Sequence, residues 1–190
     1  NIENLSKIQR LNLELQSLDE ENTRTQEEIE NIKKSLQTLD EDISREKGII
    51  IDANSNEKRL KEERGDLIQI DSKYYETEKQ SNENLDLSKN KLKKEMDNIR
   101  NLISNKQNDE ALIALNDFEN SIEIYSESYS KNRNIKKESI KRNERIKVIE
   151  KEIESWKNLL SNSEKMVSEL SERKNKFNSQ LEKLDNQPKI

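Results

Sequence analysis

Apolar residues recur along the chain at spacings that alternate between three and four. The first series starts at Ile8 and stays in one register past Ile43. An average spacing of 3.5 keeps one stripe of a helix against a partner helix, whereas a strand needs a period of two. The pattern therefore predicts a long helix with an apolar seam made of Ile8, Leu11, Leu15, Leu18, Asn22, Thr25, Ile29, Ile32, Leu36, Leu39, Ile43, Glu46, Ile50, Ala53, Glu57, Leu60, Arg64, Leu67, Asp71 and Tyr74.

This seam loses its apolar character after Ile43. Charged residues then occupy the same position of successive heptads, namely Glu57, Arg64, Asp71 and Glu78. Charges at such a position can fix register or partner choice, but they also accompany a loose stretch or a phase change, which is the interpretation we favour. Gly48 and Gly65 lie in the same zone, and each costs a helix about 1 kcal/mol relative to alanine. We expect this zone to bend more easily than the rest.

Beyond Leu85 the apolar residues predict a small phase shift of the seam, a stutter. The shifted seam contains Leu92, Met96, Ile99 and Ile103. The segment SNKQNDE, residues 104–110, has no apolar residue and is the best candidate for a chain reversal. The next seam opens with Leu115, Phe118, Ile122, Tyr125 and Tyr129.

The last register contains the only tryptophan of the chain. Trp156 is in phase with a long series of mostly apolar residues, so we expect it to pack in a seam rather than to form a binding platform. The series is Ile146, Ile149, Ile153, Trp156, Leu160, Ser163, Val167, Leu170, Lys174, Phe177, Leu181 and Leu184. Pro188 predicts the end of this helix.

Together these patterns predict an all-α fold with long helices in an antiparallel coiled coil, that is, a helical hairpin. The first helical arm covers about residues 1–103, the turn 104–110, and the second arm about 111–187. Paired residues then have numbers that add up to about 214. The charges agree in sign: acidic residues dominate 109–128 and face a net positive 86–105, whereas basic residues dominate 131–147 and face a net negative 67–83. Each exposed ion pair contributes only a few tenths of a kcal/mol.

The composition favours the same architecture. The chain of 190 residues is 29% hydrophobic and 39% charged, whereas an ordinary soluble domain has about 45–50% and about 25%. This leaves too little apolar surface for a compact core, so either disorder or thin helical seams must explain the sequence. Two glycines and one proline argue against disorder and against a sheet fold with tight turns.

Candidate chemistry is sparse. The chain has no cysteine and no histidine, which excludes disulfides, thiolate nucleophiles, imidazole bases and His/Cys zinc sites. The two glycines lie too far apart for a phosphate-binding loop. We therefore expect no catalytic residue, no metal site and no cofactor, and the chain is not expected to be an enzyme. No apolar run approaches the roughly 20 residues that span a bilayer, so we expect no membrane partner.

One basic segment, KNRNIKKESIKRNERIK, suggests a partner. Its cations could touch DNA phosphates without reading sequence, although no aromatic residues interleave with them for base stacking. We favour the alternative, in which they form a solvated face or pair with an acidic helix. The candidate contact residues are Lys131, Arg133, Lys136, Lys137, Lys141, Arg142, Arg145 and Lys147.

Two segments resemble a known family. REKGIIIDANSNEKRLKEERGDLIQIDSKYYETEKQSNENL, residues 45–85, is similar to the coiled-coil arm of bacterial SMC (structural maintenance of chromosomes) proteins. IEKEIESWKNLLSNSEKMVSELSERKNKFNSQLEKLDNQPKI, residues 149–190, resembles arm sequence of the same family. The ATP-binding loop, the signature motif and the glycine-containing hinge of that family have no counterpart in the chain, so no residue role is carried over.

The resemblance implies a structural arm between an ATPase head and a dimerising hinge, in a complex that condenses and segregates chromosomes. It also implies DNA, kleisin-type accessory subunits and a second SMC arm as partners, and a cytoplasmic, nucleoid-associated location. The alternative is a parallel dimeric coiled-coil tether or cytoskeletal rod protein.

Overall fold

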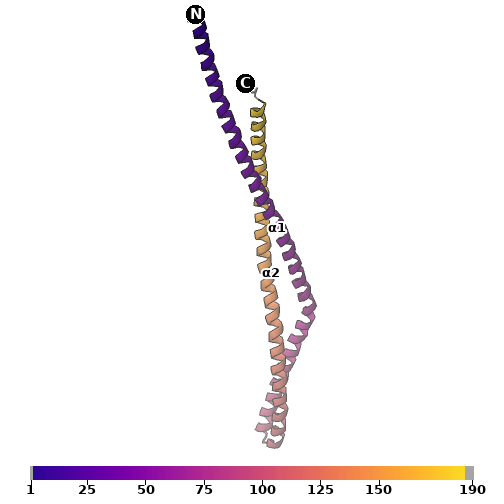
Figure 1. The fold of residues 1–190 in the computed structure, drawn as a ribbon. Coiled ribbons are helices and arrows are strands. Elements are labelled where there is room, and N and C mark those ends of the chain that lie inside the picture. The colour runs from indigo at the N-terminus through magenta and orange to yellow at the C-terminus, as the bar shows by residue number, and fades with distance from the viewer. Residues whose placement is uncertain (1, 187–190) are drawn as a thin grey trace. The chain divides into compact units, whose positions relative to one another are not determined.

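The structure is a computed structural model that describes residues 2–186. It contains two long helices, α1 (Ile2–Ser104) and α2 (Asn108–Asp185), which a short turn connects (Figure 1). The two helices pack against each other, which is consistent with the predicted helical hairpin. The turn falls inside the predicted segment 104–110, although α2 begins before its end. Pro188, which predicts the end of the second helix, lies outside the described residues.

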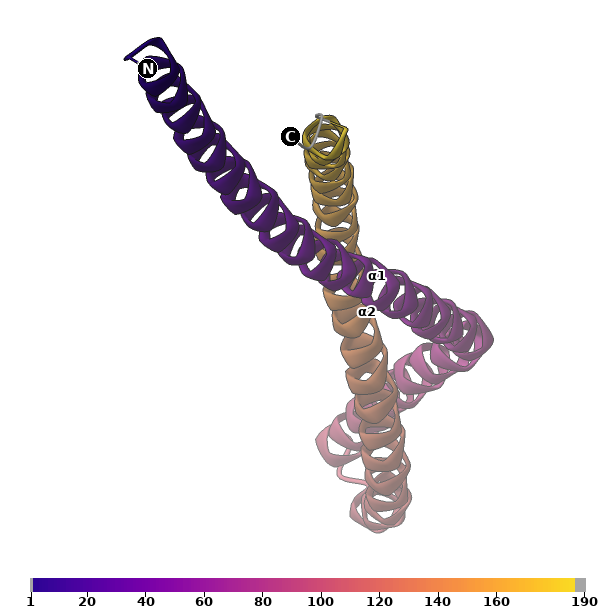
Figure 2. The same cartoon turned by 45° about the horizontal axis from the view of Figure 1, so that its top comes forward.

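The chain divides into two units, which are described separately. Among the described residues, the first combines 2–57 with 155–186, and the second is the continuous segment 58–154. The second unit contains the turn and the parts of α1 and α2 next to it, and Figure 2 shows these elements from another side.

The turn in the second unit closes without a glycine. Backbone N–H groups of Lys106 and Gln107 donate to the carbonyls of Ile103 (3.0 Å) and Leu102 (2.9 Å), which is the Schellman pattern at a helix C-terminus. The pattern needs a left-handed residue, and Lys106 supplies it with φ 60°. Asp109 and Glu110 then occupy the first turn of α2, where carboxylates interact favourably with the helix dipole. Two acidic residues therefore begin α2 three residues earlier than predicted.

In the second unit the seam of α1 stays in one register to the turn, although Tyr74, a predicted seam residue, is exposed. The buried and half-buried positions include Leu60, Arg64, Leu67, Asp71, Glu78, Ser81, Leu85, Ser88, Leu92, Glu95, Ile99 and Leu102. The predicted stutter is therefore wrong: Met96 and Ile103 are exposed, and Glu95 and Leu102 take the seam positions. Of the two interpretations favoured for the zone around Glu57 and Asp71, a loose stretch or a phase change, the phase change is absent, because the register continues through it. Contacts to the opposite helix, rather than local hydrophobicity, select the seam here.

The beginning of α2 requires the same correction. Phe118 and Tyr125 are half-buried as predicted, but Leu115, Ile122 and Tyr129 are exposed. The seam consists of Ala111, Ala114, Phe118, Ser121, Tyr125, Ser128, Asn132, Ile135, Ser139 and Arg142. Small and polar residues thus face α1, while larger apolar residues lie one position further along the helix.

Contacts in the second unit follow the order expected for a hairpin. Ser121 contacts Glu95, Asn132 contacts Ser81, Arg142 contacts Asp71 and Arg145 contacts Glu63. Residue numbers fall on α1 as they rise on α2, so the two helices run in opposite directions in this unit.

The first unit holds a more apolar seam. Leu39, Ile43 and Leu170 form a buried cluster, and Phe177 packs against it. Lys174, at a seam position of α2, pairs with Asp40 of α1 beside this cluster. Trp156 is half-buried in the predicted register, which confirms that it is a seam residue.

The first predicted turns of the α1 seam are not buried. Ile8, Leu11 and Leu15 are exposed, whereas Ile29 is the first buried residue of α1. In the hairpin register Ile29 lies near the last described turn of α2, so no described residue of α2 lies opposite the earlier turns of α1. The sequence pattern identifies the stripe but not the length of the helix that covers it.

Candidate functional site

Two of the basic residues predicted to contact nucleic acid, Arg142 and Arg145, form ion pairs with carboxylates of α1. Arg145 donates to both carboxylate oxygens of Glu63, from Nε over 2.7 Å and from Nη2 over 3.0 Å, and its Nη1 lies 3.3 Å from Oε1 of Glu152. Arg142 donates from Nε to Oδ1 of Asp71 over 2.5 Å. For these two residues the structure agrees with pairing to an acidic helix.

The bidentate pair perturbs both of its members. The hydrogen bond from Arg145 lowers the pKa of Glu63 below its usual value, and the charge of Arg59 assists. The same hydrogen bond raises the pKa of Arg145. Fork-to-fork geometry of this type adds orientation as well as energy, because both guanidinium donors must align with the carboxylate. The pair therefore fixes the facing positions of α1 and α2 in the second unit.

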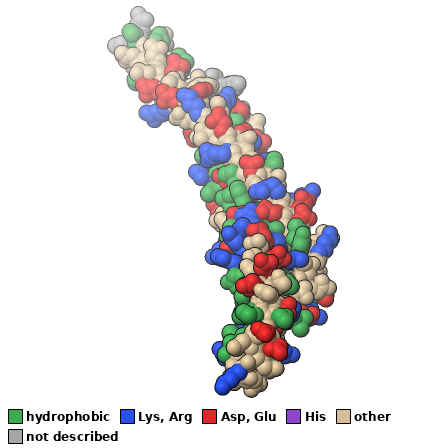
Figure 3. Space-filling model, turned by 90° about the horizontal axis from the view of Figure 1, so that it is seen from below, with side chains coloured by type: hydrophobic (Ala, Val, Ile, Leu, Met, Phe, Trp, Pro, Cys, Tyr) green, Lys and Arg blue, Asp and Glu red, His purple; other side chains and the backbone are tan. Residues whose placement is uncertain are grey.

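The other basic residues are exposed. Lys141 pairs with Glu138 on the same helix, with Nζ 2.8 Å from Oε1, and this contact lowers the pKa of Glu138. The remaining candidates, Lys131, Arg133, Lys136, Lys137 and Lys147, also lie on the surface. Figure 3 shows one face of the molecule, on which basic, acidic and hydrophobic side chains are intermingled.

Part of the basic segment borders a groove of the second unit with a volume of about 630 Å³. Apolar side chains of both helices form part of its wall, including Leu85 of α1 and Tyr129 and Ile140 of α2. Its charged lining residues are four cations and one carboxylate, namely Arg133, Lys136, Lys137, Lys141 and Glu144. The groove therefore combines positive charge with exposed apolar surface, which suits an anionic and partly apolar partner better than a bare phosphate backbone.

A cluster of polar seam residues was not predicted from the sequence. Asn132, which is buried, donates from Nδ2 to Oδ1 of Asn82 over 2.8 Å and to Oγ of Ser81 over 3.3 Å. Ser121 donates to Oε1 of Glu95 over 3.0 Å. The other oxygen of Glu95, Oε2, is buried with no hydrogen-bond partner among the described residues. The signal was present for four of these residues. Ser81 and Glu95 fall at seam positions if the first register is continued without a shift, and Ser121 and Asn132 fall in the last register if it is extended backward from Ile146.

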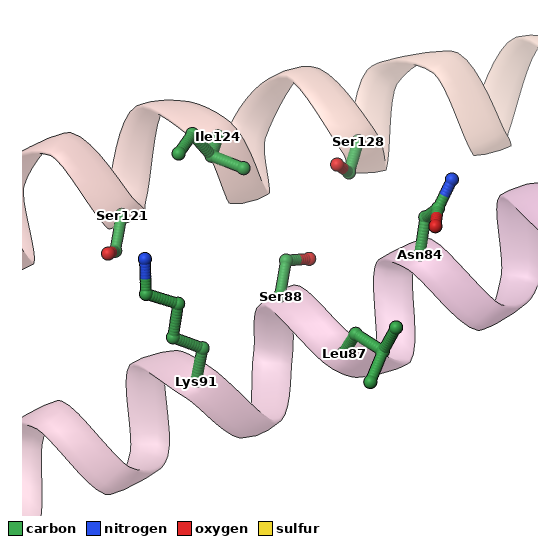
Figure 4. A pocket seen from close by; sticks show the side chains of 7 residues that line it. All are labelled: Asn84, Leu87, Ser88, Lys91, Ser121, Ile124 and Ser128. Atoms are coloured by element: carbon green, nitrogen blue, oxygen red, sulfur yellow. The ribbon is translucent and has the colours of Figure 1, made fainter.

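The serines of this seam leave a gap between the helices. Ser88 of α1 faces Ser121 and Ser128 of α2, with Lys91 beside them (Figure 4). The resulting groove has a volume of about 320 Å³. Small side chains at interior positions fill less space than leucine, so the two helices pack loosely in this part of the second unit.

The described residues supply little for metal or membrane chemistry. No group of three or more Asp or Glu side chains in residues 2–186 is arranged to hold a metal ion. None of the helices within this range is long and apolar enough to cross a membrane.

Comparison with protein-family models, with curated proteins and with solved structures found no match.

Proposed function

We propose that the chain is an antiparallel coiled-coil arm of an SMC-like chromosome condensation and segregation ATPase. In this proposal it connects an ATPase head with a hinge and carries no catalysis of its own. Its function is mechanical: it holds two modules at a set distance and transmits bending or rotation between them. The proposal starts from the sequence resemblance, and the packing of the helices supplies its physical support.

The single observation that carries the proposal is the seam of the second unit. Its heptad register continues on both helices even where serine, asparagine and glutamate replace apolar residues, and the one position it skips is the exposed Tyr74 of α1. A strict seven-residue repeat has 3.5 residues per turn, so it forces two helices into a left-handed supercoil. The ion pairs Arg142–Asp71 and Arg145–Glu63 support one antiparallel register, because any slip would separate them.

The partners and the location follow from the same proposal. Kleisin-type subunits and a second SMC arm would bind the parent protein, which would lie on the nucleoid in the cytoplasm. DNA contact would come from the exposed cations Lys131, Arg133, Lys136, Lys137, Lys141 and Lys147. Arg142 and Arg145 are excluded from this role because their guanidinium groups bind α1 carboxylates.

Cysteine pairs test the hairpin against the parallel dimer. The chain has no native cysteine, so Ser81→Cys with Asn132→Cys creates one defined pair whose native side chains lie 3.3 Å apart. The hairpin predicts efficient cross-linking within one chain by a short thiol reagent, independent of protein concentration. A parallel dimer brings identical residues together, and it would instead give linked dimers from the Ser81→Cys variant alone, which would contradict the proposal.

The family assignment needs a separate observation. An SMC arm predicts that the gene encodes an ATP-binding loop of the form GxxxxGK[ST] before the first arm segment or an ATPase signature motif after the second. Flanking sequence that encodes neither would remove the SMC proposal, even if the cross-links establish the hairpin.

A further inference from the structure

A second stripe of exposed residues runs along α2 beside its buried seam in the second unit. Its apolar members Leu112, Leu115, Ile122, Tyr129 and Ile140 have exposed fractions from 40% to 62%. We call the full series the outer stripe, and it repeats the 3–4 spacing as Leu112, Leu115, Glu119, Ile122, Ser126, Tyr129, Arg133, Lys136 and Ile140. A stripe with seam spacing and apolar members is the signature of a second helix-packing face.

The groove described above shows that part of the outer stripe is one continuous surface. Tyr129, Arg133, Lys136 and Ile140 all border it. A two-stranded hairpin needs only one narrow seam on each helix, whereas a wider apolar face is typical of helices that contact two neighbours. The outer stripe is therefore available to pack against a helix other than α1.

The charges of the outer stripe identify this helix. The stripe is acidic before Ser126, at Glu119, and basic after it, at Arg133 and Lys136. Glu119 and Arg133 are equally far from Ser126 along the chain, and so are Leu112 and Ile140. A stripe with this inverted symmetry is complementary to itself when a second copy runs antiparallel, as a twofold contact requires.

We propose that two copies of this chain dock antiparallel through their outer stripes, with the twofold axis at Ser126. Glu119 then faces Arg133 of the second copy, Leu112 faces Ile140, and Ile122 lies near Tyr129, each pair formed twice. Ser126 at the axis is small and lets the two helices approach closely. A parallel arrangement would place Glu119 against Glu119 and Arg133 against Arg133, so like charges oppose it. DNA would attract only the basic half of the stripe and repel Glu119.

The size of the contact sets the expected affinity. The stripe spans about 42 Å at 1.5 Å per residue, and with a helix width of about 10 Å it covers about 400 Å² on each copy. Stable interfaces bury about 800 Å² on each partner. We therefore expect a weak, reversible dimer with a Kd on the order of 10–100 µM.

Charge reversal at the two symmetry-related positions tests the proposal. Sedimentation equilibrium of residues 1–190 between about 5 and 300 µM should show the parent dimerising, and Arg133→Glu or Glu119→Arg should weaken the dimer at least about tenfold. The double variant Glu119→Arg/Arg133→Glu restores the complementary pairs and should return Kd to within about threefold of the parent. Lys131→Glu, which makes the same charge change off the stripe, is the matched control and should leave Kd unchanged.

Disulfide cross-linking tests where the twofold axis of the proposed dimer lies. Ser126→Cys places two thiols on the twofold axis and should form a disulfide-linked dimer rapidly under mild oxidation, whereas Ser130→Cys, exposed but off the stripe, should not. Circular dichroism checks that each variant keeps its helical content. A parent that stays monomeric up to about 300 µM, a dimer weakened equally by Lys131→Glu, or equal cross-linking of the two cysteine variants would overturn the proposal. A monomer that binds duplex DNA, with Arg133→Glu and Lys131→Glu weakening it alike, would overturn it too.

This test is independent of the proposed function. The intramolecular Ser81–Asn132 cross-link reports the hairpin whether or not two copies associate. Loss of the dimer with the cross-link intact would reject only the docking proposal.

Discussion

Arg142 of α2 and Asp71 of α1 form an ion pair at the seam, with Nε 2.5 Å from Oδ1. The side chains of Arg142 and Asp71 are 17% and 26% exposed. The guanidinium carbon of Arg142 also lies 5.5 Å from the ring centroid of Tyr74, within cation–π range. A charged pair thus occupies a position where two-helix packing normally places apolar side chains.

Removing one member of this pair should cost more than removing both. Asp71→Ala leaves a partly buried guanidinium without its carboxylate, so we expect the free energy of unfolding to fall by about 1–3 kcal/mol. Asp71→Leu/Arg142→Leu replaces the pair by an apolar contact and should be at least as stable as the parent. Urea unfolding followed by circular dichroism measures both. A double variant less stable than Asp71→Ala would contradict this expectation.

The Glu63–Arg145 pair predicts a defined loss of stability in acid. The pKa of Glu63 is lowered in the folded chain, so its contribution is fully present above the unfolded value of about 4.3 and is lost as pH falls through the folded value. Glu63→Gln should reduce stability at pH 7 but have progressively less effect toward pH 3. The pKa of Arg145 is raised and so adds no dependence in this range. Unfolding curves from pH 7 to 3 test this.

Glu62→Gln provides the control for this measurement, because Glu62 is exposed and adjacent to Glu63. If the stability difference between the parent and the Glu63→Gln variant is the same at every pH, the Glu63–Arg145 pair does not cause the acid dependence.

Replacing the left-handed residue of the turn with glycine should increase the stability of the folded chain. Lys106 has φ 60°, a conformation that costs a non-glycine residue roughly 1–2 kcal/mol. Lys106→Gly relieves this cost and makes the unfolded chain more flexible, so we expect a net gain of about 0.5–1 kcal/mol. Lys106→Ala removes the same side chain without relieving the backbone, and it should show no gain. Thermal unfolding of both variants against the parent measures the difference.

DNA binding, if it contributes to function, should depend on the exposed cations and not on the paired ones. Neutralising Lys131, Lys136 and Lys137 with glutamine should lower affinity for duplex DNA and make the slope of log K against log salt shallower by about 0.9 for each lost contact. Titration at several salt concentrations by fluorescence anisotropy measures it. No binding by the parent at low salt would remove DNA contact from the proposal.

Arg142→Gln tests the other half of this expectation. Arg142 is bound to Asp71, so the variant should reduce stability while the salt slope for DNA stays the same. A slope that falls by about one contact would mean that Arg142 binds phosphate instead.

The accuracy of the sequence patterns changes along the chain. The last register, from Ile149 through Trp156 to Leu170, matches the buried positions because its apolar residues leave one choice. Between Ser81 and Ser139 the pattern is right for Leu92, Ile99 and Phe118 but wrong for Met96 and Ile122, which are exposed. Many seam residues of this range are serine, asparagine or glutamate, which hydrophobicity alone assigns to the surface. The outer stripe supplied a competing apolar pattern one position away.

The sequence by itself predicted that the chain is helical, that it reverses between residues 104 and 110, and that the basic segment 131–147 faces acidic residues of α1. These features depend on local periodicity and on blocks of charge, and both patterns are visible in the linear sequence. Only the tertiary structure decided which of two neighbouring stripes of α2 is buried, that Arg142 and Arg145 pair with Asp71 and Glu63, and that Ile8, Leu11 and Leu15 are exposed among the described residues. Those outcomes depend on the position of the opposing helix, because a side chain becomes a seam residue only where another helix packs against it.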